Sequence, residues 1–239
     1  MTALRILITR PREDAEPFAR ALTALGHEPV IEPLLDIAFL RGPQLDLHGV
    51  QAILLTSANG ARAAAQRTSA RDIAVIAVGP TTAAAARAAG FMNVSESSGE
   101  GVDALAVFVR GRLRPADGAL LHPAGSVSAG DLAGALGTHG YSVRREVIYE
   151  AQAVDHLSGA AVAELSAGLI NVVTFFSPRT AALFVELIEE ESLGPALARV
   201  RAICLSQAVA AALAPAHFAE IKVAEKPSQD AMLAIIGPA

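Results

Sequence analysis

The sequence predicts an α/β protein made of two similar lobes, each with a mainly parallel sheet flanked by helices. Two observations support this prediction. Short strand-like runs alternate with alanine- and leucine-rich stretches of helical period, which is typical of parallel sheets covered on both faces. The second half of the chain also repeats motifs of the first half. The 239 residues, of which 52% are hydrophobic, are enough to fill two cores of ordinary domain size.

Strands and helices are predicted in turn along the chain. The clearest helix covers residues 14–25, where Ala15, Phe18 and Leu22 recur at helical spacing. Gly26 ends this helix, because glycine readily takes the left-handed conformation needed there. The predicted strands are residues 4–9, 28–37, 52–56, 73–78, 119–122, 142–149, 170–176 and 201–205. The other predicted helices are residues 59–66, 81–89, 130–136, 179–189 and 207–214.

The internal repeat consists of three pairs of segments. Residues 55–61 resemble residues 175–181, and each segment is a strand that ends in a serine at the mouth of a helix. Residues 77–83 and 202–208 again place a hydroxyl at a helix start. A weaker third pair, residues 9–30 and 123–144, matches Gly26 with Gly140. Three pairs in one order, at offsets of 114 to 125, favour two related lobes over chance likeness among alanine-rich helices.

Composition excludes several classes of protein. The net charge of −5, the two lysines and the 4% of aromatic residues argue against nucleic-acid and membrane-surface partners. The single cysteine, Cys204, excludes an internal disulfide, and we expect it to be a small buried hydrophobe. The six histidines show no paired ligand spacing, so no metal is expected. We expect no leader peptide, no membrane-spanning run and a cytoplasmic protein.

Small polar residues recur where predicted strands end and helices begin. Ligands of parallel α/β sheets bind beyond the carboxyl ends of the strands. One interpretation is that each hydroxyl only caps its helix. The other is that these residues together, with the free N–H groups at several helix starts, bind carboxylates or phosphates. Residues 79–82 lack the lysine and spacing of a nucleotide phosphate loop. The residues concerned are Thr9, Arg10, Thr56, Ser57, Thr81, Thr82, Ser177 and Ser206.

Tyr149 stands apart from these residues. It ends the predicted strand and precedes a polar segment, residues 152–158. One interpretation is an amphipathic rim residue with a wet hydroxyl. The other is a proton donor, because a phenol is protonated at neutral pH and can assist departure of a hydroxide.

Taken together, these motifs resemble the uroporphyrinogen-III synthase family over nearly the whole chain. The matching segments are residues 6–11, 55–60, 78–82, 148–150 and 175–178. The resemblance implies two α/β lobes, residues 1–37 with 152–239 and residues 41–148. It also implies a two-stranded linker made of residues 33–39 and 146–152, so that one lobe is discontinuous in sequence.

The resemblance further implies a reaction. The substrate is hydroxymethylbilane, a linear tetrapyrrole with eight carboxylates, which loses water and closes with inversion of ring D to uroporphyrinogen III. No cofactor is implied; the upstream deaminase is an implied transient partner, and a monomer is expected. Tyr149 matches the tyrosine proposed to assist loss of the hydroxyl. The implied substrate-binding residues are Thr9, Arg10, Ser57, Thr81, Ser177 and Ser206, although residues 205–207 depart from the Gly-Pro-Thr-Thr form kept at residues 79–82.

Two other functions fit the residues. A two-lobed binding module for an anionic small molecule would use the same helix starts without chemistry at Tyr149. A nucleotide-dependent transferase is less consistent with the sequence, because the chain lacks a phosphate loop and an acidic metal pair.

Overall fold

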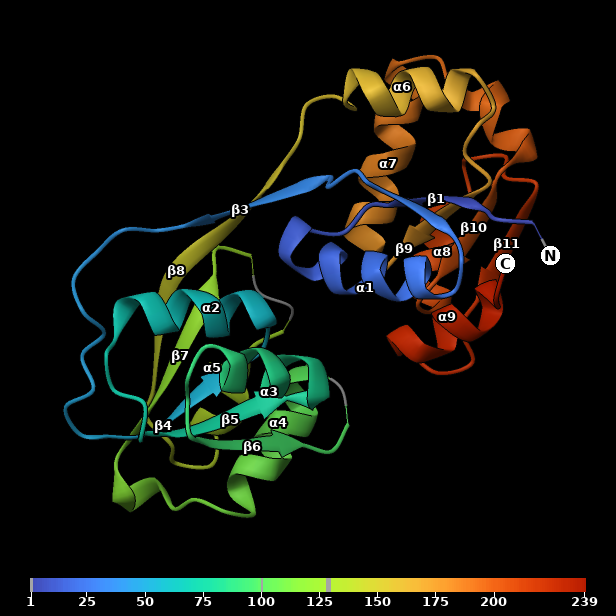
Figure 1. Cartoon of the computed structure of the whole chain (residues 1–239). Helices are drawn as coiled ribbons and strands as arrows, with labels where there is room; N and C mark the ends of the chain where they lie inside the picture. Colours follow the sequence, from blue (N-terminus) through green and yellow to red (C-terminus); the bar gives the residue numbers. More distant parts are fainter. Residues whose placement is uncertain (1, 100, 128–129) are drawn as a thin grey trace. The chain divides into compact units, whose positions relative to one another are not determined.

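The computed structural model describes residues 2–99, 101–127 and 130–239 (Figure 1). The chain forms two compact units: unit 1 is Met1–Asp36 with Gln152–Ala239, and unit 2 is Ile37–Ala151. The chain passes from one unit to the other within two neighbouring strands, β3 (Leu35–Phe39) and β8 (Val143–Ala153). Each unit is a sheet covered by helices on both faces, which confirms the predicted fold class.

Unit 1 contains a five-stranded parallel sheet in the order β11-β10-β9-β1-β2. Helices α1 and α9 pack on one face of it, and α6, α7 and α8 on the other (Figure 1). The strands are β1 (Arg5–Ile8), β2 (Glu28–Ile31), β9 (Val172–Phe175), β10 (Arg201–Cys204) and β11 (Glu220–Val223). The helices are α1 (Arg12–Ala24), α6 (Gly159–Ser166), α7 (Pro178–Glu190), α8 (Gln207–Ala212) and α9 (Gln229–Ile236), with the 3-10 helix η2 (Gly194–Arg199).

The two cores of unit 1 follow from strand alternation. Successive side chains of a strand point to opposite faces of the sheet. In β1, Ile6 and Ile8 therefore enter the core under α1 and α9, and Leu7 enters the core under α6 and α7. Cys204 of β10 is fully buried in the latter core, where burial raises the pKa of its thiol to about 12. The thiol thus stays protonated and serves as a small buried hydrophobe, as predicted.

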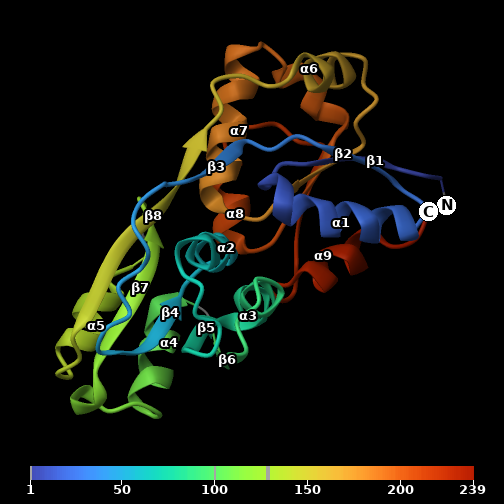
Figure 2. The ribbon, with the colours of Figure 1, turned by 60° about the vertical axis from the view of Figure 1, so that its left-hand side comes forward.

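Unit 2 contains a six-stranded sheet in the order β3-β8-β7-β4-β5-β6, of which the strands from β8 to β6 are parallel. Figure 2 shows α2 and α3 on one side of this sheet and α4 and α5 on the other. The remaining strands are β4 (Val50–Leu55), β5 (Ala74–Val78), β6 (Asn93–Ser97) and β7 (Ala119–Gly125). The helices are α2 (Ala58–Arg67), α3 (Gly79–Ala88), α4 (Gly101–Arg110) and α5 (Leu132–Gly137), with the 3-10 helix η1 (Pro115–Asp117).

The internal repeat is confirmed by the order of the strands. Each unit places five parallel strands in one arrangement: β8-β7-β4-β5-β6 in unit 2 corresponds to β2-β1-β9-β10-β11 in unit 1. The three repeated sequence pairs fall on corresponding strand–helix junctions. Gly26 and Gly140, the matched glycines, have φ angles of 89° and 83° after corresponding helices. In unit 1, however, the segment β1-α1-β2 precedes the other elements in sequence, whereas its counterpart β7-α5-β8 follows them in unit 2.

Several elements differ from the prediction. The predicted strand 28–37 is two strands, because the chain leaves the unit 1 sheet after Ile31 and enters the other sheet as β3. The last predicted strand of unit 2 continues past Tyr149 to Ala153, so this tyrosine lies inside β8 rather than at its end. Five further elements were not predicted from the sequence: β6, α4, α6, β11 and α9. Among the helices of the described residues, none has both the length and the apolar character that a membrane crossing requires.

Candidate functional site

Each sheet has one point at which the order of its strands reverses. In unit 2 the chain runs outward from β4 through β5 to β6 and then returns to the other side of β4 with β7. In unit 1 it runs from β1 to β2 and then places β9 on the other side of β1. Such switch points, at the carboxyl ends of parallel strands, are where doubly wound sheets bind ligands. Several predicted site residues lie at these two places, after β4 in unit 2 and after β1 and β9 in unit 1.

The unit 2 switch point brings Ser57 and Tyr149 together. Ser57 follows β4 and is the N-cap of α2, where its hydroxyl oxygen accepts a hydrogen bond of 2.9 Å from the Gly60 amide. The same oxygen lies 2.7 Å from the hydroxyl oxygen of Tyr149, and either group can donate in this hydrogen bond. Both side chains are half-buried. The structure therefore unites a capping serine and the candidate acid, which lie 92 positions apart in sequence.

The Tyr149 ring is seated against two glycines. A Cβ atom on Gly125, the last residue of β7, would lie 2.8 Å from Cζ and 3.0 Å from the hydroxyl oxygen of Tyr149. A Cβ atom on Gly60 would lie 3.8 Å from the opposite ring edge, at Cε1. Sequence reasoning missed Gly125 as a site residue, although the repeat aligns it with Pro11, the neighbour of Arg10. A side chain at Gly125 would therefore displace the ring, whereas one at Gly60 would meet the ring at ordinary contact distance.

Thr81 lies in the same unit but not in this cluster. It is exposed in the first turn of α3, next to the buried Thr82. Helix α3 begins at Gly79, two residues earlier than predicted, and no side chain caps it. Its first N–H groups are thus left for solvent or a ligand, and an anion is the ligand that this end of a helix favours.

His122 is a second buried polar group near the unit 2 switch point. It lies in β7, is 4% exposed, and its Nε2 atom is 3.1 Å from the hydroxyl of Thr56, which follows β4. Burial, together with the positive charge of Arg145, lowers the pKa of His122 from 6.5 to about 4. The imidazole is therefore neutral at physiological pH and acts as a hydrogen-bonding group rather than as a charge. From the sequence, His122 was only one of six histidines without paired ligand spacing.

The depressed pKa of His122 predicts a loss of stability in acid. The unfolded chain binds the proton more readily than the folded chain, so the His122 contribution is present above pH 6.5 and declines as the pH falls toward 4. Between pH 7 and pH 5 we expect a loss of about 2 kcal/mol in the free energy of unfolding of unit 2. Urea unfolding followed by tyrosine fluorescence measures it, because both tyrosines lie in unit 2 and the chain has no tryptophan.

The matched variants are His122→Gln, which keeps a hydrogen-bonding side chain, and His48→Gln, which removes an exposed histidine of the same unit. The first should lose most of the extra acid sensitivity, and the second should keep it. Equal pH dependence in the wild type and in His122→Gln would refute the assignment of this effect to His122.

The unit 1 switch point holds Thr9 and Arg10. Thr9 is fully buried, and its hydroxyl donates a 2.8 Å hydrogen bond to the carbonyl oxygen of Thr174 in β9. Its side chain is therefore engaged within the sheet and does not face a ligand. Arg10 is different: its guanidinium carbon lies 4.2 Å from the ring centroid of Phe176, and its Nη2 atom is 3.9 Å from a carboxylate oxygen of Asp14. The cation is thus held beside the carboxyl ends of β1 and β9.

Ser177 and Ser206 both precede helices in unit 1, with different bonding. Ser177 caps α7, accepting from the Thr180 amide at 3.1 Å, and its hydroxyl oxygen lies 2.8 Å from that of Thr180. Ser206 has N-cap geometry before α8, but its side chain makes no capping hydrogen bond. The first turn of α7 also carries the exposed Arg179, which sequence reasoning left out of the site. Ser206, which follows β10, lies one strand away from the switch point.

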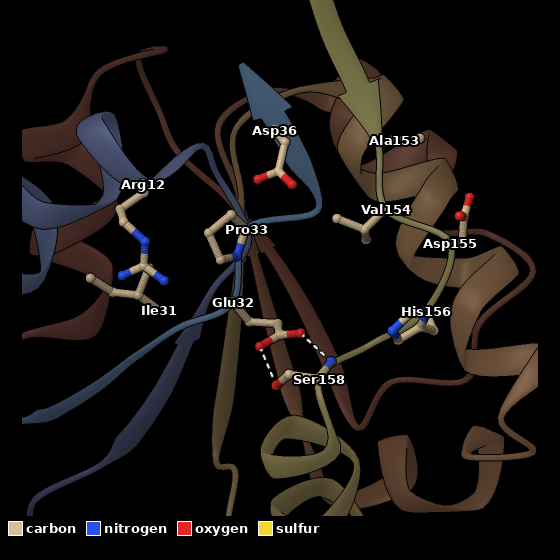
Figure 3. Close-up of a pocket in the computed structure, with 10 residues that line it drawn as sticks. All are labelled: Arg12, Ile31, Glu32, Pro33, Asp36, Ala153, Val154, Asp155, His156 and Ser158. Atoms are coloured by element: carbon tan, nitrogen blue, oxygen red, sulfur yellow. Dashed lines mark hydrogen bonds between the residues drawn. The ribbon is translucent and has the colours of Figure 1, made fainter. Parts of the chain in front are cut away.

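Unit 1 also has a cavity of about 590 Å³, which is distinct from these residues (Figure 3). Its lining includes the carboxylates of Glu32, Asp36 and Asp155 and the basic side chains of Arg12 and His156. None of the predicted site residues is among the described residues that line it. Three acidic side chains against two basic ones disfavour a polycarboxylate ligand in this cavity.

One wall of the cavity is fixed by a helix cap. Glu32 is 8% exposed, and its carboxylate accepts hydrogen bonds of 2.6 Å from the Ser158 amide and 2.7 Å from the Ser158 hydroxyl (Figure 3). Ser158 in turn caps α6. We assign Glu32 to holding the start of α6, where a negative charge is favourable. Within residues 2–99, 101–127 and 130–239, no group of three or more histidine, cysteine, aspartate and glutamate side chains is placed to hold a metal ion.

Fold and site define a class of protein: a two-unit, doubly wound α/β protein with a strand-order switch point in each unit. Residues 16–234 match the family model described as uroporphyrinogen-III synthase HemD. The chain therefore belongs to the uroporphyrinogen-III synthase family, whose members are lyases of porphyrin and haem biosynthesis and act on a tetrapyrrole.

Two solved structures support the same fold. The chain is similar to uroporphyrinogen-III synthetase from Helicobacter pylori, with a TM-score of 0.62 and 18% identity over 98% of each chain. It is also similar to a mutant uroporphyrinogen III synthase from Thermus thermophilus, with a TM-score of 0.54 and 17% identity over 98% of each chain. None of the curated proteins compared with the chain matches it.

Proposed function

We propose that this chain closes hydroxymethylbilane to uroporphyrinogen III, and that Tyr149 donates the proton with which the substrate hydroxyl leaves as water. The family match supports the reaction. The observation that supports the role of Tyr149 is its placement: its hydroxyl is held by Ser57 at the switch point of unit 2. A phenol is protonated at neutral pH and can act as a general acid.

This ring closure requires the protein to control the geometry of the substrate as well as to supply an acid. Loss of water gives an azafulvene cation, which the substituted position of ring D attacks to form a spiro intermediate. That intermediate fragments and recloses with ring D inverted. Because the bilane also closes spontaneously to the symmetric isomer, the protein must hold the reacting carbons in the less accessible arrangement.

We assign binding of the substrate carboxylates to the polar groups at strand ends in both units. In unit 1, Arg10 and Arg179 supply positive charge close to the start of α7, which Ser177 caps. The free N–H groups at the start of a helix bind carboxylates, so such a site does not require many lysines. Thr81 and Ser206 supply further helix starts. Thr9 enters the proposal only as support for the strand end next to Arg10, since its hydroxyl is bonded to Thr174.

A coupled assay tests the proposed reaction. Porphobilinogen and a deaminase generate hydroxymethylbilane, and the purified chain is added in increasing amounts. We expect uroporphyrinogen III to replace the symmetric isomer in proportion to the amount of chain. Formation of the symmetric isomer alone, as in the uncatalysed closure, would show that the chain is instead a binding module or has another activity.

Arg10→Ala tests the proposed carboxylate site. The variant should bind uroporphyrinogen III about tenfold more weakly, because a charge-assisted hydrogen bond is lost. Arg20→Ala, which removes an exposed arginine of α1, serves as the control and should bind the product like the wild type. If neither Arg10→Ala nor Ser177→Ala weakens binding in an equilibrium titration, the unit 1 assignment is wrong.

The proposal extends to where the protein acts and whether it assembles with other chains. We infer that the protein acts in the cytoplasm as a monomer and takes its substrate from the deaminase through transient contact. The support is chemical, since a substrate that closes spontaneously must reach the enzyme soon after its release. Sedimentation of the chain alone and mixed with deaminase tests both the monomer and the contact.

A further inference from the structure

We propose that Ser57 and Gly125 are positioning residues that fix the direction and the hydrogen bonding of the Tyr149 hydroxyl. This inference rests on the proposed function of Tyr149 as the proton donor. It assigns Ser57 to the tyrosine rather than to a substrate carboxylate. Two independent features of the described residues support it: the hydrogen bonds of Ser57 and the steric seat formed by Gly125.

The first feature is the bonding of the Ser57 hydroxyl. Its oxygen accepts the Gly60 N–H of α2 at 2.9 Å, which leaves one proton and one lone pair for the Tyr149 hydroxyl at 2.7 Å. Bonding to an amide in the first turn of a helix polarises the serine hydroxyl and makes it a better donor. Ser57 thus links the positive end of a ten-residue helix to the phenol oxygen.

This link matters most after the proton has moved. As the substrate carbon–oxygen bond breaks, its electron pair leaves with the oxygen, and the Tyr149 proton completes a water molecule. The phenolate oxygen left behind can only accept, so Ser57 becomes the donor in their shared bond. The proton that the substrate releases when the ring closes and regains aromaticity returns to the phenolate. A hydrogen bond that strengthens as charge develops lowers the activation barrier and leaves the affinity for substrate largely unchanged.

The second feature is the seat of the ring. Gly125 lies opposite Tyr149 where the register of β7 and β8 shifts, next to Ala124. The Gly125 carbonyl accepts a 2.6 Å hydrogen bond from Arg145, and the Tyr149 carbonyl accepts one of 3.0 Å from the Ser126 amide. The backbone is therefore held on both strands. A Cβ atom at Gly125 would lie 2.8 Å from Cζ and 3.0 Å from the hydroxyl oxygen of Tyr149, so the ring would have to leave the position in which it bonds to Ser57.

Steady-state kinetics in the coupled assay test the inference. Ser57→Ala should lower kcat about tenfold with KM changed by less than about twofold, and Ser57→Thr, which keeps the hydroxyl, should restore most of kcat. Gly125→Ala should lower kcat by about tenfold or more, since small displacements of a catalytic group are costly. The matched controls are Ser228→Ala, which removes the cap of α9, and Gly137→Ala, where an added Cβ meets nothing within 4 Å. Both controls should retain wild-type kcat.

The decisive comparison is the double variant Ser57→Ala with Tyr149→Phe. If Ser57 acts through the tyrosine hydroxyl, the double variant should be no slower than Tyr149→Phe, within about threefold. Effects that multiply, or wild-type kcat in Ser57→Ala, would overturn the inference and leave Ser57 as a helix cap. A wild-type chain that makes no uroporphyrinogen III would instead refute the proposed function, so the two failures are distinguishable.

Discussion

Replacing Tyr149 by phenylalanine is expected to lower kcat by about 100-fold while leaving both units folded, because general acid catalysis contributes on this scale. Phenylalanine keeps the ring, which fills the seat between Gly125 and Gly60. It removes only the hydroxyl oxygen, whose partner is Ser57. The measurements are the rate and isomer ratio in the coupled assay, with circular dichroism as the check on folding.

Tyr141→Phe is the matched control, since it deletes the hydroxyl of the only other tyrosine in the sequence. Tyr141 is 7% exposed, and its hydroxyl donates a 2.7 Å hydrogen bond to the carbonyl of Leu113. Its loss should cost about 1 kcal/mol of stability without changing kcat. A wild-type rate in Tyr149→Phe would remove Tyr149 from the chemistry and return it to the role of a rim residue.

Arg67→Met should give the largest loss of stability among the variants considered, about 2 kcal/mol in unit 2. The Arg67 side chain is 10% exposed and bonds to Glu146 at 2.5 Å, to the carbonyl of Pro43 at 2.6 Å and to that of Leu40 at 3.3 Å. Methionine fills much of the space but leaves these acceptors without their donor. Because Glu146 is 38% exposed, water compensates part of the loss, so the expected cost is below that of a fully buried pair.

Urea unfolding followed by tyrosine fluorescence reports this loss, as it does for His122. Arg87→Met is the control, because Arg87 and Glu96 are about half exposed and lie 3.8 Å apart at the surface of the same unit. An exposed pair of this kind is worth less than about 1 kcal/mol. Similar midpoints for both variants would show that the Arg67 contacts contribute no more than a surface ion pair.

The repeated serines show how much the sequence could predict. Ser57 and Ser177 were paired by the repeat and expected at helix starts, and both cap the predicted helices, α2 and α7. This success has a local cause, because a cap depends on residues within one turn of the chain. The choice between cap and ligand was left open, and the structure shows the cap in both cases.

Elements that were missed show where local patterns fail. Residues 101–110, which form α4, include three valines and one phenylalanine, residues that also suit a strand. These residues form a helix because Leu105, Ala106 and Val109, which recur at helical spacing, pack together against the sheet. The strand 28–37 was likewise predicted as one piece, because nothing in its hydrophobicity marks the change from one sheet to the other after Ile31.

By itself, the sequence determined the α/β class, the doubling of the fold and the placing of hydroxyl groups at helix starts. Alternation, repeated motifs and caps each depend on residues that are close together in the chain, so they can be recognised without the tertiary structure. The tertiary structure alone decided that Tyr149 lies inside β8, bonded to Ser57 and seated on Gly125. It also decided that the Thr9 hydroxyl is bonded to Thr174 within the sheet. These relations depend on atoms within about 3 Å of each other. Residues 92 and 165 positions apart reach that distance only when parallel strands assemble side by side.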